Sequence, residues 1–388
     1  MTEDFYTGCI DDLKRAGRYR EMHTISGVQG AEVLVDGRRA ICMCSNNYLG
    51  LAGHPALIEA HVKAARQFGS GAGASRLISG NMDLHARLEE RIARFKGVEK
   101  ALLFNSGYQA NVGIITALAG PGDTIYSDQL NHASIVDGSR LSKAAVRVYH
   151  HCNMRELEQI ISSDKGAGRK LIVTDSVFSM DGDLAPLEEI VEIKRRHGAM
   201  LLIDEAHATG VIGPGGRGLA AAYGLEGEID LTMGTLGKAL GSFGAFVGAS
   251  FHLIDYLINT ARSFIFTTAL PPPVAASAIA AFDVIESEPE LITKLNEAAR
   301  YMRKGLKDIG FNVPDGETPI IPVIIGDEHK TMNCCERLLD LRVFVQGIRP
   351  PTVPQNGSRL RVTVMATHTR EHLDRALEAF KRLENYEI

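Results

Sequence analysis

The chain has 388 residues, 45% of them apolar, and a net charge of -5 with no long basic run. Its length suggests two or three domains with buried cores, and its charge argues against nucleic acid or an anionic membrane as the main partner. It contains no stretch of about 18 consecutive apolar residues, the length that a membrane span requires.

The first residues are acidic and no signal-peptide pattern follows them. The six cysteines form no C-x-x-C pair. Cys42 and Cys44 would share one face of a strand, but no second ligand pair follows, so we expect no metal site. Scattered thiols without a framework are typical of a reducing compartment, which indicates a cytoplasmic protein.

From about residue 100 to 250, short apolar runs alternate with segments of helical spacing. The predicted strands are Ala101–Phe104, Thr124–Ser127, Val146–Tyr149, Leu171–Ser176, Met200–Asp204, Leu231–Gly234 and Ala245–Gly248. The predicted helices between them are Gln109–Ala119, Ser134–Ser142, Met154–Ser162 and Leu187–His197. Ungapped apolar strands that alternate with helices indicate an α/β fold with a mostly parallel seven-stranded sheet, covered on both faces.

After the proline run Leu270–Pro273 the pattern changes to long amphipathic helices and then to a smaller α/β unit. The predicted helices here are Val274–Ser287, Pro289–Gly310, Met332–Leu341 and Arg370–Leu383, and the predicted strands are Ile320–Ile325, Phe344–Ile348 and Arg361–Val364. We therefore expect an N-terminal segment (1–49), a large domain (50–285) and a small C-terminal α/β domain (286–388).

Polar motifs follow several of these strands, at the edge where ligands gather in an open parallel sheet. In Asn105–Asn111, Gly107 would permit a tight turn, and the free N–H groups of the new helix suit a phosphate. An ordinary helix entry capped by Ser106 is the alternative. His132 has a ring that could stack on a flat ligand, although a lone histidine is more often structural.

Two further strand ends carry hydroxyl and carboxylate groups. Ser179 is a candidate donor to a cofactor or to a substrate carboxylate, whereas Asp181 and Asp183 are expected to cap the turn and the next helix. Asp204 ends a strand as a carboxylate that needs a cationic partner, and His207 lies three residues on.

Lys238 lies in the octapeptide Thr235–Ser242 (TLGKALGS), directly after a predicted strand. Small residues around the amine would leave room for an imine with an aromatic aldehyde, although a surface lysine in a glycine-rich loop is the alternative. With Asp204 and His207 upstream, the pattern favours pyridoxal 5'-phosphate (PLP): a carboxylate for the ring nitrogen and a lysine for the aldehyde carbon. Thr235 and Ser242 are plausible hydroxyls beside the phosphate or the imine.

Five ordered motifs carry a resemblance over about residues 5–385. They are Asn46–Leu51 (NNYLGL), Asn131–Ser134 (NHAS), Phe178–Gly182 (FSMDG), Asp204–His207 (DEAH) and Thr235–Lys238 (TLGK). The chain resembles the α-oxoamine synthases, PLP-dependent enzymes of fold type I. The resemblance implies that an amino acid condenses with an acyl thioester to give an α-amino ketone.

Gly347–Pro354 (GIRPPTVP) distinguishes among members of that group. It resembles the biotin-pathway members, which join L-alanine to a pimeloyl thioester carried on CoA or on an acyl carrier protein (ACP). The alternative is a 2-amino-3-ketobutyrate CoA ligase, which shares several motifs and toward which Leu236 leans slightly. A non-catalytic homologue is the rival from another class, but such proteins typically lose the lysine that Lys238 represents.

The resemblance also implies residue roles. Lys238 holds PLP and then acts as the base, Asp204 pairs with the ring nitrogen, His132 stacks on the ring and His207 contacts the ring oxygen. The remaining implied contacts are Gly107, Tyr108, Ser179 and Thr235 to cofactor or phosphate, Arg349 to the amino acid carboxylate, and Arg20, Asn46 and Thr352 to substrate. A homodimer is implied as well, with Thr267 and Thr268 reaching the partner's phosphate.

Overall fold

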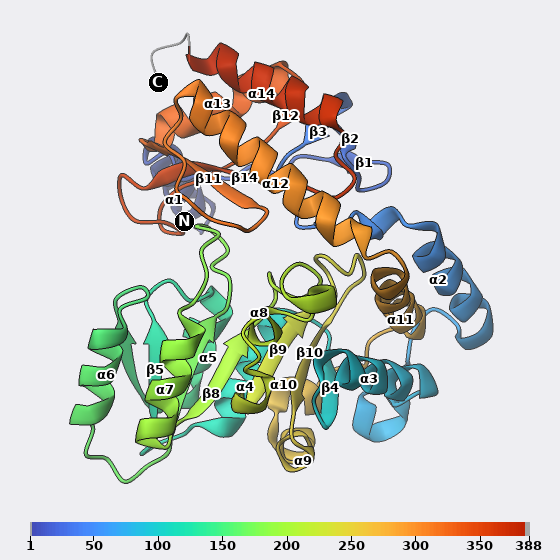
Figure 1. Cartoon of the computed structure of the whole chain (residues 1–388), viewed down its shortest axis with the longest axis vertical. Coiled ribbons are helices and arrows are strands. Elements are labelled where there is room, and N and C mark those ends of the chain that lie inside the picture. The colour runs from blue at the N-terminus through green and yellow to red at the C-terminus, as the bar shows by residue number, and fades with distance from the viewer. Residues whose placement is uncertain (1, 385–388) are drawn as a thin grey trace. The chain divides into compact units, whose positions relative to one another are not determined.

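A computed structural model of the protein describes residues 2–384, which form two compact units. The larger unit comprises Leu51–Ser179 and Asp183–Ile292. The smaller unit comprises the described residues up to Gly50, the short segment Met180–Gly182, and the described residues from Thr293 onward. Figure 1 labels the elements of both units.

The larger unit contains one seven-stranded sheet and its covering helices. Its strands are β4 (Lys100–Phe104), β5 (Thr124–Asp128), β6 (Ala145–Tyr149), β7 (Lys170–Asp175), β8 (Met200–Asp204), β9 (Leu231–Thr235) and β10 (Ala245–Ala249). Its longer helices are α2 (Pro55–Phe68), α3 (Asp83–Lys96), α4 (Gly107–Leu118), α5 (Ala133–Ser142), α6 (Met154–Ser163), α7 (Leu187–His197), α9 (Phe251–Thr260) and α11 (Pro272–Ser287). The short helices are α8 (Leu219–Ala222), α10 (Arg262–Ile265) and a π-helix, η2 (Arg76–Gly80).

The sheet has the order β4-β10-β9-β8-β7-β5-β6. All pairs are parallel except those of β10, which runs antiparallel to both β4 and β9. The predicted mostly parallel α/β fold is therefore confirmed. Because β5, β7, β8 and β9 are parallel, their carboxyl ends meet at one edge of the sheet.

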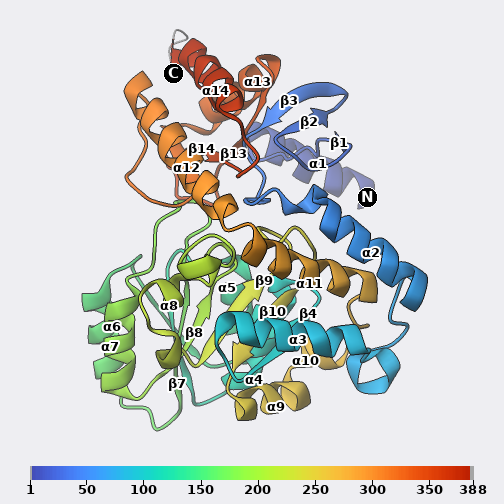
Figure 2. The ribbon, with the colours of Figure 1, turned by 45° about the vertical axis from the view of Figure 1, so that its right-hand side comes forward.

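Helices cover both faces of this sheet, as the ungapped apolar strands predict. Figure 2 shows α3, α7 and α8 in front of the sheet and α4 behind it. On the α4 side, Ile114 and Ile115 join Leu257 of α9, Phe264 of α10 and the strand residues in one buried cluster. The helices begin and end where the sequence supplies caps: Ser106 caps α4, and Gly97 and Gly198 end α3 and α7 in the left-handed conformation.

The smaller unit contains two sheets, with the orders β1-β2-β3-β12 and β11-β14-β13. Its strands are β1 (Ile25–Ser26), β2 (Glu32–Val35), β3 (Arg38–Cys42), β11 (Ile320–Gly326), β12 (Val343–Phe344), β13 (Gln346–Ile348) and β14 (Ser358–Thr363). Its helices are α1 (Thr2–Arg15), α13 (Glu328–Asp340), α14 (Arg370–Glu384) and most of α12 (Glu290–Ile309). The parallel pair β3–β12 joins the first fifty residues to the C-terminal part of the chain.

The predicted single strand Phe344–Ile348 is wrong in one respect, because the structure divides it. Phe344 pairs with Cys42 in the first sheet, whereas Gln346 and Ile348 pair with β14 in the second. The chain changes sheets at Val345, which is itself buried. The first half is buried and the second is half-buried, and the sequence shows no glycine, proline or charged residue between Phe344 and Gln346 that would mark the break.

Among the described residues, no helix is both long and apolar enough to cross a membrane.

A buried ion pair fixes the turn that follows β8. Lys96, 4% exposed, donates from Nζ to Oε2 of Glu205, which is 0% exposed. Lys96 Nζ also donates to the carbonyl oxygen of Arg217 at 2.6 Å, and Glu205 Oε1 accepts from the N–H of Ala220 at 2.9 Å. The pair thus ties the end of α3 to the turn after β8 and to α8.

Replacing one partner of this pair should destabilise the fold strongly, because it leaves the other charge buried and uncompensated. We expect Lys96→Met to lower the free energy of unfolding by about 3–5 kcal/mol. The double variant Lys96→Met/Glu205→Gln should recover much of the loss, because it removes the stranded charge. Arg196→Met, in the exposed pair with Glu158, is the control and should cost less than about 1 kcal/mol. Equal urea-unfolding midpoints for Lys96→Met and the wild type would contradict this view.

His368 is a buried neutral histidine in the smaller unit. Its Nδ1 accepts from the N–H of Met365 at 2.9 Å, so its Nε2 carries the proton and donates to the carbonyl oxygen of Cys42 at 3.1 Å. Burial, and secondarily the nearby His372, lower the pKa of His368 to about 4. The neutral ring thereby links the end of β14 to β3.

This lowered pKa makes stability depend on pH with a definite sign. Below an ordinary pKa of about 6.5 the unfolded chain binds a proton at His368 that the folded protein does not bind, so stability rises with pH across this range. The contribution is fully present above about pH 6.5, and about 3 kcal/mol of it is lost as the pH falls to about 4. His368→Gln, which keeps an acceptor and a donor, should therefore show a shallower fall in unfolding free energy between pH 7 and pH 5. Parallel curves for the two proteins would contradict the assignment.

Candidate functional site

Lys238 lies in the loop between β9 and β10, and backbone hydrogen bonds shape that loop. The N–H of Leu236 donates to the carbonyl of Gly244, and the N–H of Ser242 donates to the carbonyl of Leu236. The Nζ of Lys238 lies 2.7 Å from Nε2 of His207, so an amine and an imidazole meet at the carboxyl edge of the sheet. His207 is buried and Lys238 is half-buried.

Packing and backbone conformation require a glycine at position 241, so this glycine does not indicate room for a ligand. Its φ is +60°, and a Cβ there would lie 2.3 Å from the backbone nitrogen of Ala52. Ser242, expected beside the phosphate or the imine, instead donates to the carbonyl of Val274 at 3.0 Å. Those two features of the octapeptide are therefore structural, because they anchor the loop to neighbouring segments.

Asp204 ends β8 as a carboxylate that is only 4% exposed. Neutral groups hold it: Nδ2 of Asn111 donates to Oδ2 at 2.8 Å, and the N–H of Ala206 donates to Oδ1 at 2.8 Å. Asp175 is its partner across the parallel register of β7 and β8. Burial raises the pKa of Asp175 well above its usual range, and the charge of Asp204 adds to this effect.

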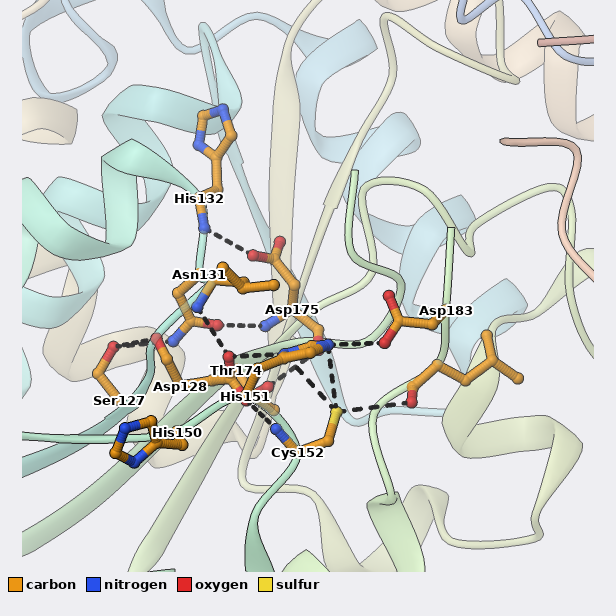
Figure 3. Close-up of polar contacts among 12 residues, drawn as sticks. Ser127, Asp128, Asn131, His132, His150, His151, Cys152, Thr174, Asp175 and Asp183 are labelled. Carbon is orange, nitrogen blue, oxygen red and sulfur yellow. Dashed lines mark hydrogen bonds and ion pairs between the residues drawn. The ribbon is translucent and has the colours of Figure 1, made fainter. Parts of the chain in front are cut away.

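The loop that carries His132 is anchored at two strand ends (Figure 3). The side-chain amide of Asn131 donates to Ser127 Oγ and to the carbonyl of Val173, and its oxygen accepts from the N–H of Asp175. The N–H of His132 donates to Oδ2 of Asp175 at 2.7 Å. His132 is thus held beside Asp175, the register partner of Asp204.

Figure 3 also shows His151, which bridges two carboxylates. Its Nδ1 lies 3.0 Å from Asp128 and its Nε2 lies 2.7 Å from Asp183. Burial alone would lower the pKa of His151, but these two hydrogen bonds raise it to about 12. The thiol of Cys152 lies 3.7 and 3.6 Å from the two ring nitrogens, hence over the ring and off the lone pair of either. This arrangement is that of an ion-pair network.

The β4–α4 connection differs from the expected tight turn. Gly107 is the first residue of α4, its φ is not positive, and a Cβ there would meet only Met233 at 3.7 Å, an ordinary contact. The backbone therefore does not require glycine, and that part of the interpretation is wrong. Ser106 caps the helix, as the alternative interpretation proposes, by accepting from the N–H of Gln109.

Several predicted hydroxyls of the larger unit take part in hydrogen bonds. Thr235 Oγ1 donates to the carbonyl of Gly244, and Tyr108 donates to the carboxylate of Asp137, which raises the pKa of the phenol. Asn105 donates to the carbonyl of Thr268 at 2.7 Å and to Thr267 Oγ1 at 3.4 Å, which places that segment beside the start of α4.

The segment that follows β7 passes from one unit to the other. Ser179, half-buried, is its last residue in the larger unit. The expectation that Asp181 and Asp183 cap the turn and the next helix is wrong. Asp181 pairs with Arg359 in the smaller unit, and Asp183 pairs with His151, while α7 starts after Pro186.

The remaining predicted residues belong to the smaller unit. Arg20, Arg349 and Thr352 line a cavity of about 610 Å³. Arg349 is buried and donates to the carbonyl of Tyr19, and burial, with a smaller contribution from Arg20, lowers its pKa. Asn46 lies elsewhere in this unit, where its Oδ1 accepts from Arg361 at 3.1 Å.

Sequence reasoning missed Asn111, Ser134 and Asp175 as parts of the site. Asn111 and Ser134 lie within motifs that the sequence analysis singled out, and Asp175 lies at a predicted strand end. Their polar side chains are buried at the carboxyl edge of the sheet. A polar residue at an otherwise apolar, core-facing position is the signal that identifies such a residue.

Residues 38–380 match the family described as aminotransferase class I and II. A protein named 8-amino-7-oxononanoate synthase from Geobacter sulfurreducens is 53% identical over 97% of this chain and 97% of its own length. Among solved structures, a serine palmitoyltransferase from Sphingomonas wittichii is 32% identical and covers 98% of this chain and 96% of its own, with a TM-score of 0.94. The 8-amino-7-oxononanoate synthase of Francisella tularensis is 28% identical and covers 90% of this chain and 98% of its own, with a TM-score of 0.78. The chain belongs to the class I and II aminotransferase family and, within it, to the α-oxoamine synthases.

Proposed function

We propose that the protein condenses L-alanine with a pimeloyl thioester in a PLP-dependent reaction. The products are 8-amino-7-oxononanoate, CO2 and the free thiol. The observation that carries this proposal is the 53% identity, over 97% of both chains, to a protein named for that product. The thioester carrier is CoA or an acyl carrier protein.

The residues at the carboxyl edge of the large sheet fit PLP. Asp204 is a buried carboxylate held by neutral donors, which suits the protonated nitrogen of a pyridine ring. Lys238 supplies the amine that would hold the aldehyde carbon, and His207 lies beside that amine. When bound, PLP supplies an electron sink that stabilises negative charge at the α-carbon of the amino acid.

Other roles in the proposed reaction fall to side chains of both units. Lys238 Nζ would take the α-proton of alanine, and Nε2 of His207, 2.7 Å away, would orient that amine. His132 would lie against the cofactor ring, and Gly107, Tyr108, Ser179 and Thr235 would contact cofactor or phosphate. In the smaller unit, Arg349 would hold the amino acid carboxylate, a task suited to a guanidinium, and Arg20, Asn46 and Thr352 would contact substrate.

A thiol-release assay tests the reaction. Pimeloyl-CoA with L-alanine should give a kcat/KM at least about 10-fold higher than acetyl-CoA with glycine, the discrimination expected from a few pocket contacts. Pimeloyl-ACP replaces pimeloyl-CoA in a parallel series to identify the carrier. Lys238→Ala is the inactive control, because it removes the covalent tether and the base together. A preference for acetyl-CoA with glycine would favour a ketobutyrate ligase, and thiol release with no pair would favour a non-catalytic homologue.

We also propose that the active form is a homodimer. Two exposed apolar side chains, Ile78 in η2 (81% exposed) and Phe266 after α10 (70% exposed), flank a backbone bridge between Ser75 and Thr268. Large apolar groups gathered on an exposed surface are typical of a surface that another protein covers. Thr267 and Thr268 lie in this segment, so a second copy there would bring them to a neighbouring site.

Mixed dimers test whether the sites are shared. Lys238→Ala chains are combined with chains that carry Thr267→Leu and Thr268→Leu, both inactive alone, under conditions that exchange subunits. Because a hybrid dimer would contain one intact site, the mixture should regain part of the activity, up to about a quarter of the wild-type value for random pairing of two sites. A mixture that stays inactive after exchange is confirmed by mass spectrometry, or an active monomer in sedimentation, would contradict the shared site.

A further inference from the structure

Four polar side chains from β8, α4 and the start of α5 form one hydrogen-bonded chain at the carboxyl edge of the large sheet. Asp204 ends β8, Asn111 lies in α4, Ser134 lies in α5 and His132 precedes α5. Nδ2 of Asn111 lies 2.8 Å from Asp204 Oδ2 and 2.9 Å from Ser134 Oγ, and Ser134 Oγ lies 2.8 Å from His132 Nδ1. Asn111 and Ser134 are both fully buried.

The carboxylate sets the direction of the first hydrogen bonds in this chain. An ionised carboxylate only accepts, so the group that Asn111 presents to Asp204 is its NH2, and the second N–H of that group points at Ser134 Oγ. The opposite orientation of the amide would place Oδ1 against the carboxylate. As a result, Oδ1 of Asn111 is buried without a hydrogen-bond partner in the described part of the chain.

The same logic fixes the proton on His132. The backbone N–H of Ser134 lies 3.2 Å from His132 Nδ1, and an N–H only donates, so Nδ1 is an acceptor. Because Nδ1 is an acceptor, the hydroxyl of Ser134, which accepts from Asn111, donates its own proton to Nδ1. With two donors on Nδ1, the proton of the neutral ring is on Nε2.

We propose that Asn111 and Ser134 are positioning residues that keep His132 neutral, with its proton on Nε2, and couple this tautomer to the charge of Asp204. The Nε2–H then faces outward as a hydrogen-bond donor that can act on bound substrate. A proton on Nδ1 would point at the backbone N–H of Ser134, which can only donate, and would require the Ser134 hydroxyl to turn its own proton away. The use of that Nε2–H in catalysis rests on the proposed function, whereas the tautomer does not.

Other groups also act on His132. Although His132 is exposed as a whole, desolvation of its ring lowers its pKa, the negative charge of Asp204 opposes this effect, and the positive charge of Lys238 adds to it. Asp175 contacts only the backbone N–H of His132. Ser134 adds to the effects of desolvation and Lys238, because its hydroxyl stabilises the neutral ring alone.

Hydrogen–deuterium exchange at the carbon between the two ring nitrogens, followed by mass spectrometry of peptides, measures the pKa of a single histidine without an activity assay. In the holoenzyme, His132 should titrate below the ordinary value of about 6.5. In Ser134→Ala the pKa should rise by about one unit, the shift that one hydrogen bond of ordinary strength supplies. Asn111→Ala should shift it in the same direction by less, because the hydroxyl then loses only its orientation.

Ser139→Ala is the matched control, because Ser139 is a buried serine of the same helix whose hydroxyl donates to the carbonyl of Ile135. It should leave the pKa of His132 unchanged. Ser134→Thr keeps a hydroxyl and should restore the low value, which separates a hydrogen-bond effect from a packing effect. An unchanged pKa of His132 in Ser134→Ala, or an equal shift in Ser139→Ala, would overturn the proposal.

The pH profile of kcat distinguishes this proposal from the proposed reaction. If His132 donates from Nε2 during turnover, one apparent pKa of the kcat profile belongs to His132. In Ser134→Ala that apparent pKa should rise by about one unit, as the pKa of the ring does. A pKa shift without thiol release from any substrate pair would refute the proposed reaction and leave the tautomer assignment intact. Thiol release without a pKa shift would do the reverse.

Discussion

The negative charge buried on Asp204 is the constraint on which the rest of the site depends. A carboxylate with little access to water is stable only where donors or a cation compensate it. Here Asn111 and the backbone of Ala206 supply donors, and the raised pKa of Asp175 keeps a second charge away from the same edge. A cationic ring nitrogen would complete the compensation. The parallel strands matter because they bring Asp175 and Asp204 into register at that edge.

The backbone that carries Asp204 is fixed by a buried ion pair at the next residue. Glu205 follows Asp204, and its pairing with Lys96 fixes the turn that leads to His207. Gly218 takes part through its φ of +113° and through a Cβ position only 2.0 Å from Glu205 Oε2, so no larger residue fits beside the pair. The ion pair thus supports the geometry in which His207 meets Lys238, although neither Lys96 nor Glu205 lies at that contact.

The sequence predicted the large sheet well, because a sheet of this kind depends on local patterns. Ungapped apolar runs of about five residues identify buried parallel strands, and polar residues after them fall at the ligand edge. Side-chain roles that depend on contacts across elements were harder to predict. Gly107 does not serve a tight turn, Asp183 pairs with His151 instead of capping a helix, and the strand around Val345 divides between two sheets. Each outcome depends on which distant segment lies opposite, and one sequence does not contain that information.

Asn111 shows how a site can lose some stability and gain a defined protonation state. Its buried Oδ1, which has no hydrogen-bond partner among the residues that the structure describes, costs about 1–3 kcal/mol relative to a satisfied acceptor. An apolar residue would avoid that cost but would remove the donor that orients the Ser134 hydroxyl, and the backbone N–H of Ser134 would then have to hold the tautomer of His132 without that hydroxyl. An aspartate would add a second carboxylate beside Asp204. Asparagine is the side chain of this size that offers two donors from one atom, one for the carboxylate and one for the hydroxyl. The positions of the hydrogen atoms from Asp204 to His132 therefore follow from one buried carboxylate, the amide of Asn111 and the backbone N–H of Ser134.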